Sequence, residues 1–213
     1  MARAPRCWPL LALAALTPGC GGGKAPAAAS DETSVATDWR SVATPQDRRR
    51  IRDWRSSWLD ALASARAAGK GGEIDAEGAL LDPDAGSGSP YPAPGDYRCR
   101  VVKVGAQASG LLPLVAYPAF ACRVSGTGAA IRLEKLTGSQ RPQGILYTDN
   151  GSRLIFLGTM VLGDERGALG YGRDRQRDMA GVFERIGPKR WRLALPQPAW
   201  ESLLDVVEFV PAG

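Results

Sequence analysis

The sequence predicts a mostly β protein of the α+β class: an antiparallel meander of about eight strands, closed into a small barrel or folded into a sandwich, with one N-terminal amphipathic helix. Beyond Asp96, short runs of alternating apolar and polar residues are separated by turn residues. Before them, one long segment carries apolar residues at helical spacing. Short links between consecutive strands favour antiparallel neighbours.

The helix is expected at residues 45–68. Thr44 is a suitable N-cap, Pro45 fits the first helical position and Gly69 is a natural stop. The apolar face consists of Ile51, Trp54, Trp58, Leu62 and Ala65. An arginine-rich first half, Arg48, Arg49, Arg50, Arg52 and Arg55, is interpreted as the solvated face of a docked helix, with contact to lipid phosphates as the alternative.

A Pro- and Gly-rich loop at 81–95 leads into the β region at 96–211. Strands are expected at 97–104, 119–124, 130–136, 144–148, 153–161, 181–186, 190–195 and 204–210. In the seventh, Trp191 and Leu193 face one way and Arg190 and Arg192 the other. Asn150-Gly151 predicts a hairpin with a type I′ turn.

The N-terminal residues predict export. Residues 1–19 combine Arg3 and Arg6 with a short apolar run, as in a signal peptide, and Cys20 follows where a lipoprotein would be acylated. Residues 20–38 are then a flexible tether and 39–213 a single globular domain. We expect a periplasmic protein held by its lipid at the outer membrane; an ordinary cleavable signal, cut within "APAAAS", is the alternative.

The cysteines fit this location. Of four cysteines, Cys7 is removed with the signal and Cys20 is the lipidation site, which leaves Cys99 and Cys122. Both lie in predicted strands of an exported protein, so a disulfide is expected, worth about 3 kcal/mol in the chain-entropy model. A zinc site is disfavoured because two thiolates without histidine do not complete a tetrahedral shell.

The chain contains no histidine, which excludes Ser-His-Asp and Cys-His catalysis and histidine-ligated metal sites. We expect no metal, no cofactor and no catalytic residue. The 27 basic residues stand against 22 acidic ones and form no long run, so nucleic-acid binding is not expected. A glycan hydrolase remains an alternative through a carboxylate cluster interleaved with arginines: Asp164, Glu165, Asp174, Asp178 and Glu184.

The stretch "KLTGSQRPQGILY", residues 135–147, is the candidate anion site. "TGSQRPQG" is expected to connect two strands, with Pro142 preventing ladder pairing. Backbone N–H groups near Ser139 and the fork of Arg141 are candidates for binding a phosphate, carboxylate or partner. A Ser139 nucleophile activated by Lys135 is a weaker alternative. Arg173 and Arg175 of "GRDRQRD" are further candidate partner contacts.

Several motifs together resemble an uncharacterised bacterial envelope family, the domain of unknown function numbered forty-eight ninety-three. They are "GDYRCRVVKVG", "YPAFACRV", "KLTGSQRPQGILY", "IFLGTMVLGDE", "YGRDRQRDMAGVFERIGPKRWRLALPQP" and "LDVVEFVP". The resemblance covers about residues 38–211 and implies no activity, cofactor or catalytic residue.

The leading functional hypothesis is therefore a non-enzymatic, lipid-anchored envelope module that binds an envelope protein or glycan, or has a structural role. A peptidoglycan hydrolase is one alternative. A small barrel that holds an apolar ligand is another, and it requires an internal cavity.

Overall fold

The computed structural model describes residues 38–213. The predicted signal peptide, Cys20 and the predicted tether up to residue 37 lie outside the described residues. Residues 34–213 form a compact unit of their own. Within 38–213, no helix is long and apolar enough to cross a membrane.

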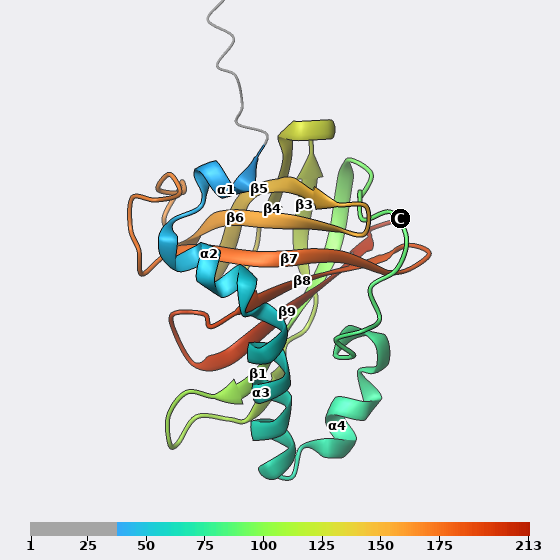
Figure 1. Cartoon of the computed structure of the whole chain (residues 1–213), viewed down its shortest axis with the longest axis vertical. Helices are drawn as coiled ribbons and strands as arrows, with labels where there is room; N and C mark the ends of the chain where they lie inside the picture. The colour runs from blue at the N-terminus through green and yellow to red at the C-terminus, as the bar shows by residue number, and fades with distance from the viewer. Residues whose placement is uncertain (1–37) are drawn as a thin grey trace, which may run out of the picture. The chain divides into compact units, whose positions relative to one another are not determined.

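An antiparallel barrel forms the body of the domain (Figure 1). Its strands are β1 (Gly95–Ala106), β3 (Phe120–Ser125), β4 (Ile131–Lys135), β5 (Gln140–Asn150), β6 (Arg153–Leu162), β7 (Asp178–Gly187), β8 (Arg190–Pro196) and β9 (Ser202–Pro211). Each pairs with the next in this order, and β1 pairs with β9 from Tyr97↔Pro211 to Ala106↔Ser202, which closes the barrel. All eight predicted strands are confirmed, and the barrel replaces the sandwich alternative. The prediction missed β2 (Leu114–Ala116), which pairs with the end of β1.

Inward-facing glycines permit tight curvature in β5 and β6. Gly144 and Gly158 are paired across the two strands. A Cβ on Gly158 would lie 2.3 Å from the carbonyl oxygen of Gln143 and 2.5 Å from the Phe156 ring. The ring of Phe156 therefore lies against glycine backbone, which a larger residue would displace.

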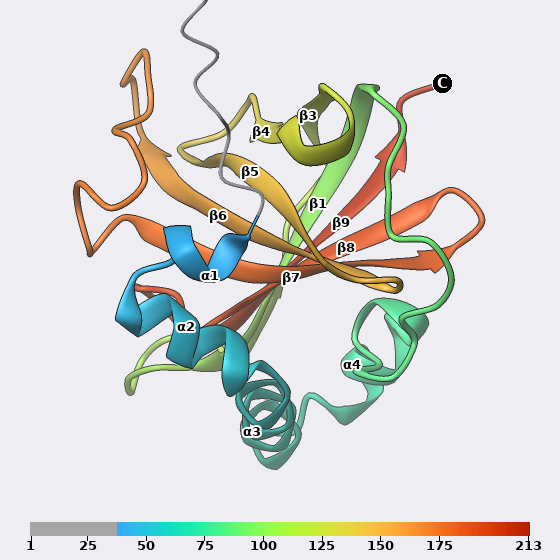
Figure 2. The same cartoon turned by 45° about the horizontal axis from the view of Figure 1, so that its top comes forward.

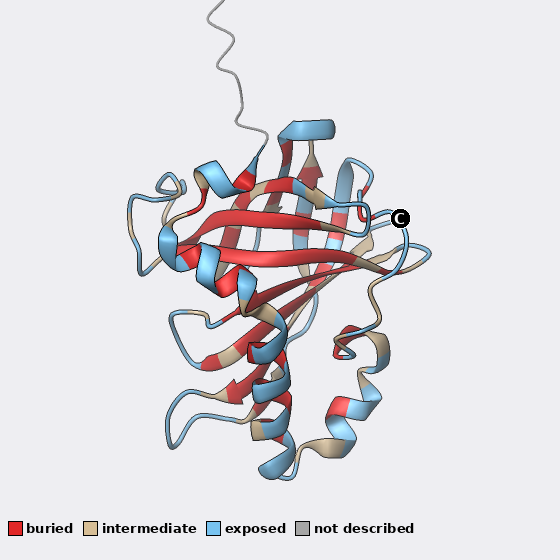
Figure 3. Ribbon diagram, viewed as in Figure 1, coloured by how far each residue is buried: buried red, intermediate tan, exposed pale blue. Residues whose placement is uncertain are grey.

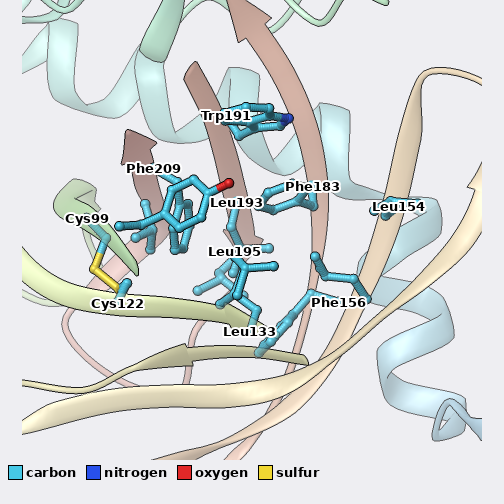
Figure 4. Close-up of a cluster of buried hydrophobic side chains, with 14 of the residues drawn as sticks. Cys99, Cys122, Leu133, Leu154, Phe156, Phe183, Trp191, Leu193, Leu195 and Phe209 are labelled. Carbon is cyan, nitrogen blue, oxygen red and sulfur yellow. A yellow bond between two sulfur atoms is a disulfide. The ribbon is translucent and has the colours of Figure 1, made fainter. Parts of the chain in front are cut away.

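The interior is filled by apolar side chains from every barrel strand. Tyr97 lies 6.0 Å from Trp191 and 6.5 Å from Phe209, measured between ring centroids, in edge-on geometry. The predicted disulfide between Cys99 and Cys122 is present and links diagonal positions of β1 and β3 (Figure 4). Aromatic packing and the disulfide thus close the end of the barrel where β1 begins.

The predicted helix 45–68 is two helices, which corrects the expectation. α2 (Pro45–Arg52) ends at Asp53, and α3 (Trp54–Ala67) follows at once in a new direction (Figure 1). Thr44 caps α2 as expected, accepting a hydrogen bond from the Asp47 N–H, and the chain leaves α3 through Gly69 at φ 83°. Further helical segments, α1 (Trp39–Val42), α4 (Gly71–Ala76), η1 (Gly78–Leu80) and η2 (Gly128–Ala130), were not predicted.

The helices cover part of the outer surface of the barrel (Figures 2 and 3). α3 places Trp58 and Ala61 against outward residues of β1, β8 and β9, such as Val102 and Val206. α1 and α2 cover outward residues of β5, β6 and β7, including Ile155. Since the strands are covered on both faces here, this part of the barrel wall is buried throughout.

Arg192 shows what this covering does to a charged side chain. The predicted alternation is correct, and Arg192 points outward from β8. It is nevertheless 0% exposed because Trp58 and the 79–83 segment lie over it. Its guanidinium pairs with Glu184 at 2.8 Å and donates to backbone carbonyls of that segment.

Two turn predictions are wrong in detail. The β5–β6 hairpin exists, but neither Asn150 nor Gly151 has a positive φ, so the turn is not type I′. The Asn150 side chain instead accepts hydrogen bonds from the N–H groups of Ser152 and Arg153. Pro142 is not in a connection: β5 begins at Gln140 and Pro142 pairs with Met160. The ladder from β4 ends at Glu134↔Gln143, so Pro142 lies just beyond that edge, where its missing N–H is tolerated.

A candidate ligand cavity at the open end of the barrel

A cavity of about 320 Å³ occupies one end of the barrel, opposite the end that is closed by Tyr97, Trp191 and Phe209. Every barrel strand contributes at least one inward side chain to its wall: Val101, Phe120, Lys135, Pro142, Met160, Met179, Leu195 and Val207, in strand order. Only the interior of a closed barrel brings all eight strands together. The entrance is bordered by exposed residues, among them Tyr117, Ser139 and Glu201.

Lys103 on β1 forms the polar side of the cavity. Its Nζ lies 3.1 Å from Oδ2 of Asp205, on the paired strand β9, and 3.1 Å from Oε2 of Glu201. Ser202 Oγ donates to the other oxygen of Asp205. Burial acts to lower the pKa of Lys103, but the charges of Asp205 and Glu201 outweigh it and the pKa is raised. Lys103 is therefore a charged ammonium group whose charge is balanced by neighbouring carboxylates.

Lys135, at the end of β4, lines another side of the cavity. Its polar partners are backbone carbonyl oxygens, whereas those of Lys103 are carboxylates. Lys135 is 4% exposed, and its Nζ donates to the carbonyl oxygens of Thr137 and Gln140 at 2.8 Å each. The same nitrogen lies 3.6 Å from the centre of the Phe120 ring. Within residues 38–213 no carboxylate lies within 4.0 Å of it. Burial, followed by the positive charges of Arg141 and Lys103, lowers its pKa to about 8.

The turn between β4 and β5 folds back over Lys135. Gly138 has φ 89°, and a Cβ there would lie 2.7 Å from Lys135 Nζ and 2.9 Å from the Phe120 ring. This residue is therefore fixed as glycine both by its conformation and by close approach. The adjacent Ser139 is exposed and lines the cavity, but no hydrogen bond joins it to Lys135 in the described part of the chain. The structure thus places Ser139 at the entrance without forming the Ser139–Lys135 dyad.

The predicted Arg141 site has a different arrangement from the one expected. Its guanidinium donates to the carbonyl oxygens of Gly138, Gly163 and Glu165, and so joins the β4–β5 turn to the β6–β7 loop. Arg141 supports the wall beside Lys135 but does not line the cavity. Arg173 and Arg175 are exposed on the β6–β7 loop, and the structure does not bring them to the cavity either.

The carboxylates proposed for hydrolysis do not converge on this cavity. Glu165 and Asp174 both pair with Arg177, and Glu184 pairs with Arg192 on the outer surface. Asp178 is buried below α2, where its Oδ1 accepts from the Gly172 N–H. None of the five lines the cavity. Within residues 38–213, no group of three or more metal-ligating side chains gathers at any point.

Large apolar side chains are exposed near the entrance. Leu112 is 68% exposed, and with Leu111 and Tyr117 it lines a depression that shares Lys103 and Glu201 with the cavity. Trp200, in the β8–β9 loop, lines another depression that shares Met160 and Leu195. The loops that carry these residues lie on the left of Figure 1, together with the β6–β7 loop. Exposed apolar side chains thus lie among charged and polar ones around the entrance.

Sequence reasoning missed Lys103, Asp205 and the methionines as site residues. The pattern that could have found them was present in the sequence. Lys103 alternates in phase with Val101 on β1, and Asp205 in phase with Val207 on β9, so both charged residues fall on the inward, apolar face. A charged residue on the apolar face of a strand needs a partner or a water-filled space. Lys135 shows the same pattern, in phase with Ile131 and Leu133.

Comparison with known proteins gives one assignment. The searches of curated proteins and of solved structures found no match. A family described as "Domain of unknown function (DUF4893)" matches residues 39–209, which include all the barrel strands except the last residues of β9. The chain therefore belongs to the DUF4893 family.

Proposed function

We propose that this domain is a non-enzymatic binding module of the bacterial cell envelope that holds a small, largely apolar ligand in the open end of its barrel. The observation that carries this proposal is the cavity lined by all eight barrel strands. Its volume of about 320 Å³ lies at the lower end of the range for small-molecule sites. A water molecule occupies about 30 Å³, so the cavity has room for on the order of ten non-hydrogen atoms.

The composition of the wall supports ligand binding. Apolar side chains predominate, and Met160 and Met179 provide flexible, polarizable surface. A few polar groups, Lys103, Lys135 and Asp205, lie among them. Apolar walls with a small number of placed polar groups are typical of ligand sites.

The cellular context in this proposal rests on the N-terminal sequence. We propose that residues 1–19 direct export and that Cys20 carries a lipid, which would hold the barrel at the periplasmic side of the outer membrane. The Cys99–Cys122 disulfide is consistent with an oxidising compartment. A ligand of the envelope, or an apolar part of a membrane component, is then the natural occupant.

Native mass spectrometry of the protein taken from its own host's envelope in lipid nanodiscs tests both parts of the proposal. The expected result is a covalent acyl mass on Cys20 and a non-covalent ligand of on the order of ten non-hydrogen atoms. Ser139→Trp fills the entrance and should abolish the non-covalent mass. Ser152→Trp, in the β5–β6 turn at the other end of β5, is the matched control and should retain it. A ligand that persists in Ser139→Trp would place binding elsewhere, and a chain without acyl mass would remove the anchor.

A further inference from the structure

The two buried lysines of the cavity are in unequal electrostatic states. Lys103 is 8% exposed and is neutralised by Asp205, which is 4% exposed. Lys135 is 4% exposed and its described polar partners are backbone carbonyl oxygens. The cavity is lined by two lysines and two carboxylates, but Asp205 and Glu201 both bind Lys103, which leaves Lys135 as the ammonium without a carboxylate partner among the described residues. Glu201 is exposed at the entrance, where its carboxylate screens Lys103 and not Lys135.

An ammonium group removed from water without a counter-ion is costly. Carbonyl dipoles and the Phe120 ring stabilise Lys135 in part. Arg141 adds a second positive charge behind the β4–β5 turn, and its described hydrogen bonds also go to carbonyl oxygens. This side of the cavity therefore has a positive potential that an anion entering past Ser139 would reduce.

The apolar part of the wall continues around the barrel on both sides of Lys135. Phe120 and Pro142 lie on the strands that flank β4, and Met160 and Met179 lie on the next two strands. A molecule with an anionic group at Lys135 and an apolar chain against these residues would satisfy both kinds of surface.

We infer that the ligand is a medium-chain amphipathic carboxylate whose acidic group pairs with Lys135 and whose chain lies against the methionines. This inference rests on the proposed function and specifies its ligand class. Lys103 makes the opposite wall polar as well. Because Asp205 and Glu201 already balance its charge, it does not need an anionic group of the ligand as a partner.

The test is isothermal titration of residues 34–213, which form a compact unit containing the closed barrel and the clusters that cover it. Octanoate, 1-octanol and octylammonium share one chain and differ in head-group charge. Octanoate should bind about ten-fold more tightly than 1-octanol, as one charge-assisted contact would give. Lys135→Met should remove this advantage and leave 1-octanol unchanged within about two-fold. Lys189→Met, in the exposed β7–β8 turn at the other end of the barrel, is the matched control and should leave octanoate binding unchanged.

A measurement on the unaltered domain guards against misfolding of the variant. The groups that face Lys135 are Arg141 on β5, Lys103 on β1, and the Lys103 partners Asp205 and Glu201. Lys135 loses its proton as the pH rises through about 8, whereas the pKa of Lys103 is raised. A bound anion shifts the Lys135 transition upward, so octanoate affinity should fall between pH 8 and 10 while 1-octanol affinity stays constant.

Each outcome is decisive. A preference for octanoate that disappears in Lys135→Met and at high pH supports the inference. Equal binding of octanoate and 1-octanol overturns it and leaves the proposed function standing. Tighter binding of octylammonium overturns it and identifies Asp205 and Glu201 as the selecting groups. Failure of all three to bind overturns the inference together with the proposed apolar-ligand function.

Discussion

Replacement of Arg192 by Met should destabilise the domain strongly, although Arg192 does not line the cavity. Its side chain is fully buried on the outer surface of β8. The guanidinium lies 4.5 Å from the centre of the Trp58 ring and pairs with Glu184 at 2.8 Å. It also donates to the carbonyl oxygens of Ala79, Leu80, Asp82 and Pro83. One side chain thus fixes α3 and the segment after α4 to the barrel.

The magnitude follows from what the substitution leaves behind. Glu184 is 8% exposed, and without Arg192 its charge has no partner of comparable strength. Breaking a buried ion pair on one side costs about 3 to 5 kcal/mol. For a domain of this size the corresponding fall in Tm is about 6 to 20 °C. This is a large part of the 5 to 15 kcal/mol that stabilises a typical domain.

Urea unfolding, followed by tryptophan fluorescence, measures the change in the free energy of unfolding. Arg175→Met, on the exposed β6–β7 loop, is the control and should stay within about 0.5 kcal/mol of the wild type. The variant carrying both Arg192→Met and Glu184→Met should be more stable than Arg192→Met alone, because no unpaired carboxylate remains. A loss below about 1 kcal/mol for Arg192→Met, or additive losses in the double variant, would refute this account of the ion pair.

Three further predictions concern the disulfide and two titrating groups. Replacing Cys99 and Cys122 together by Ala should lower the free energy of unfolding by about 3 kcal/mol; reductant should destabilise the wild type equally and the variant not at all. Lys135 deprotonates near pH 8 in the folded state and at 10.5 when unperturbed, so folding releases protons between these values and stability rises with pH. The wild type should gain about 1 to 3 kcal/mol relative to Lys135→Met from pH 7.5 to 10.5 in urea titrations, and parallel pH profiles would contradict the buried charge. Asp178 has a pKa raised chiefly by burial, and within the described residues its Oδ2 and the Oγ1 of its cross-strand neighbour Thr159 have no hydrogen-bond partner. Its ionised form therefore costs stability above its folded pKa, and Asp178→Asn should raise Tm at pH 7 more than at pH 3; a lower Tm at both values would show that the carboxylate is needed.

The strands were predictable because their signals are local. Alternation in β8, with Trp191 and Leu193 opposite Arg190 and Arg192, depends only on the two-residue period of an extended chain. The break at Asp53 was not predictable, since the apolar spacing continues from Ile51 to Trp54, whereas in the structure α2 packs on β7 and α3 on β1 and β9.

The candidate site was partly accessible from the sequence. The stretch after Lys135 is a candidate anion or partner contact in the sequence, and the structure places part of it, including Ser139 and Pro142, in the wall of a cavity. Arg141 supports the turn through backbone carbonyls, and Lys135, first considered as the activator of Ser139, is the buried cation. Hydrogen bonding of a guanidinium to carbonyl oxygens of another loop leaves no pattern in the sequence.

By itself, the sequence determined the β-rich fold class, the positions of the eight barrel strands, the two cysteines available for a disulfide and the family. These follow from periodicity, turn chemistry and residue content, which act over short distances along the chain. Tertiary structure alone decided the closure of the barrel through β1 and β9, the cavity, and the contrast between Lys103, which is paired with Asp205, and Lys135, which within residues 38–213 has only carbonyl oxygens as polar partners. Lys103 and Asp205 are 102 residues apart in the chain. Their charges cancel only because closure places their strands side by side, and long-range pairing of this kind depends on the whole fold.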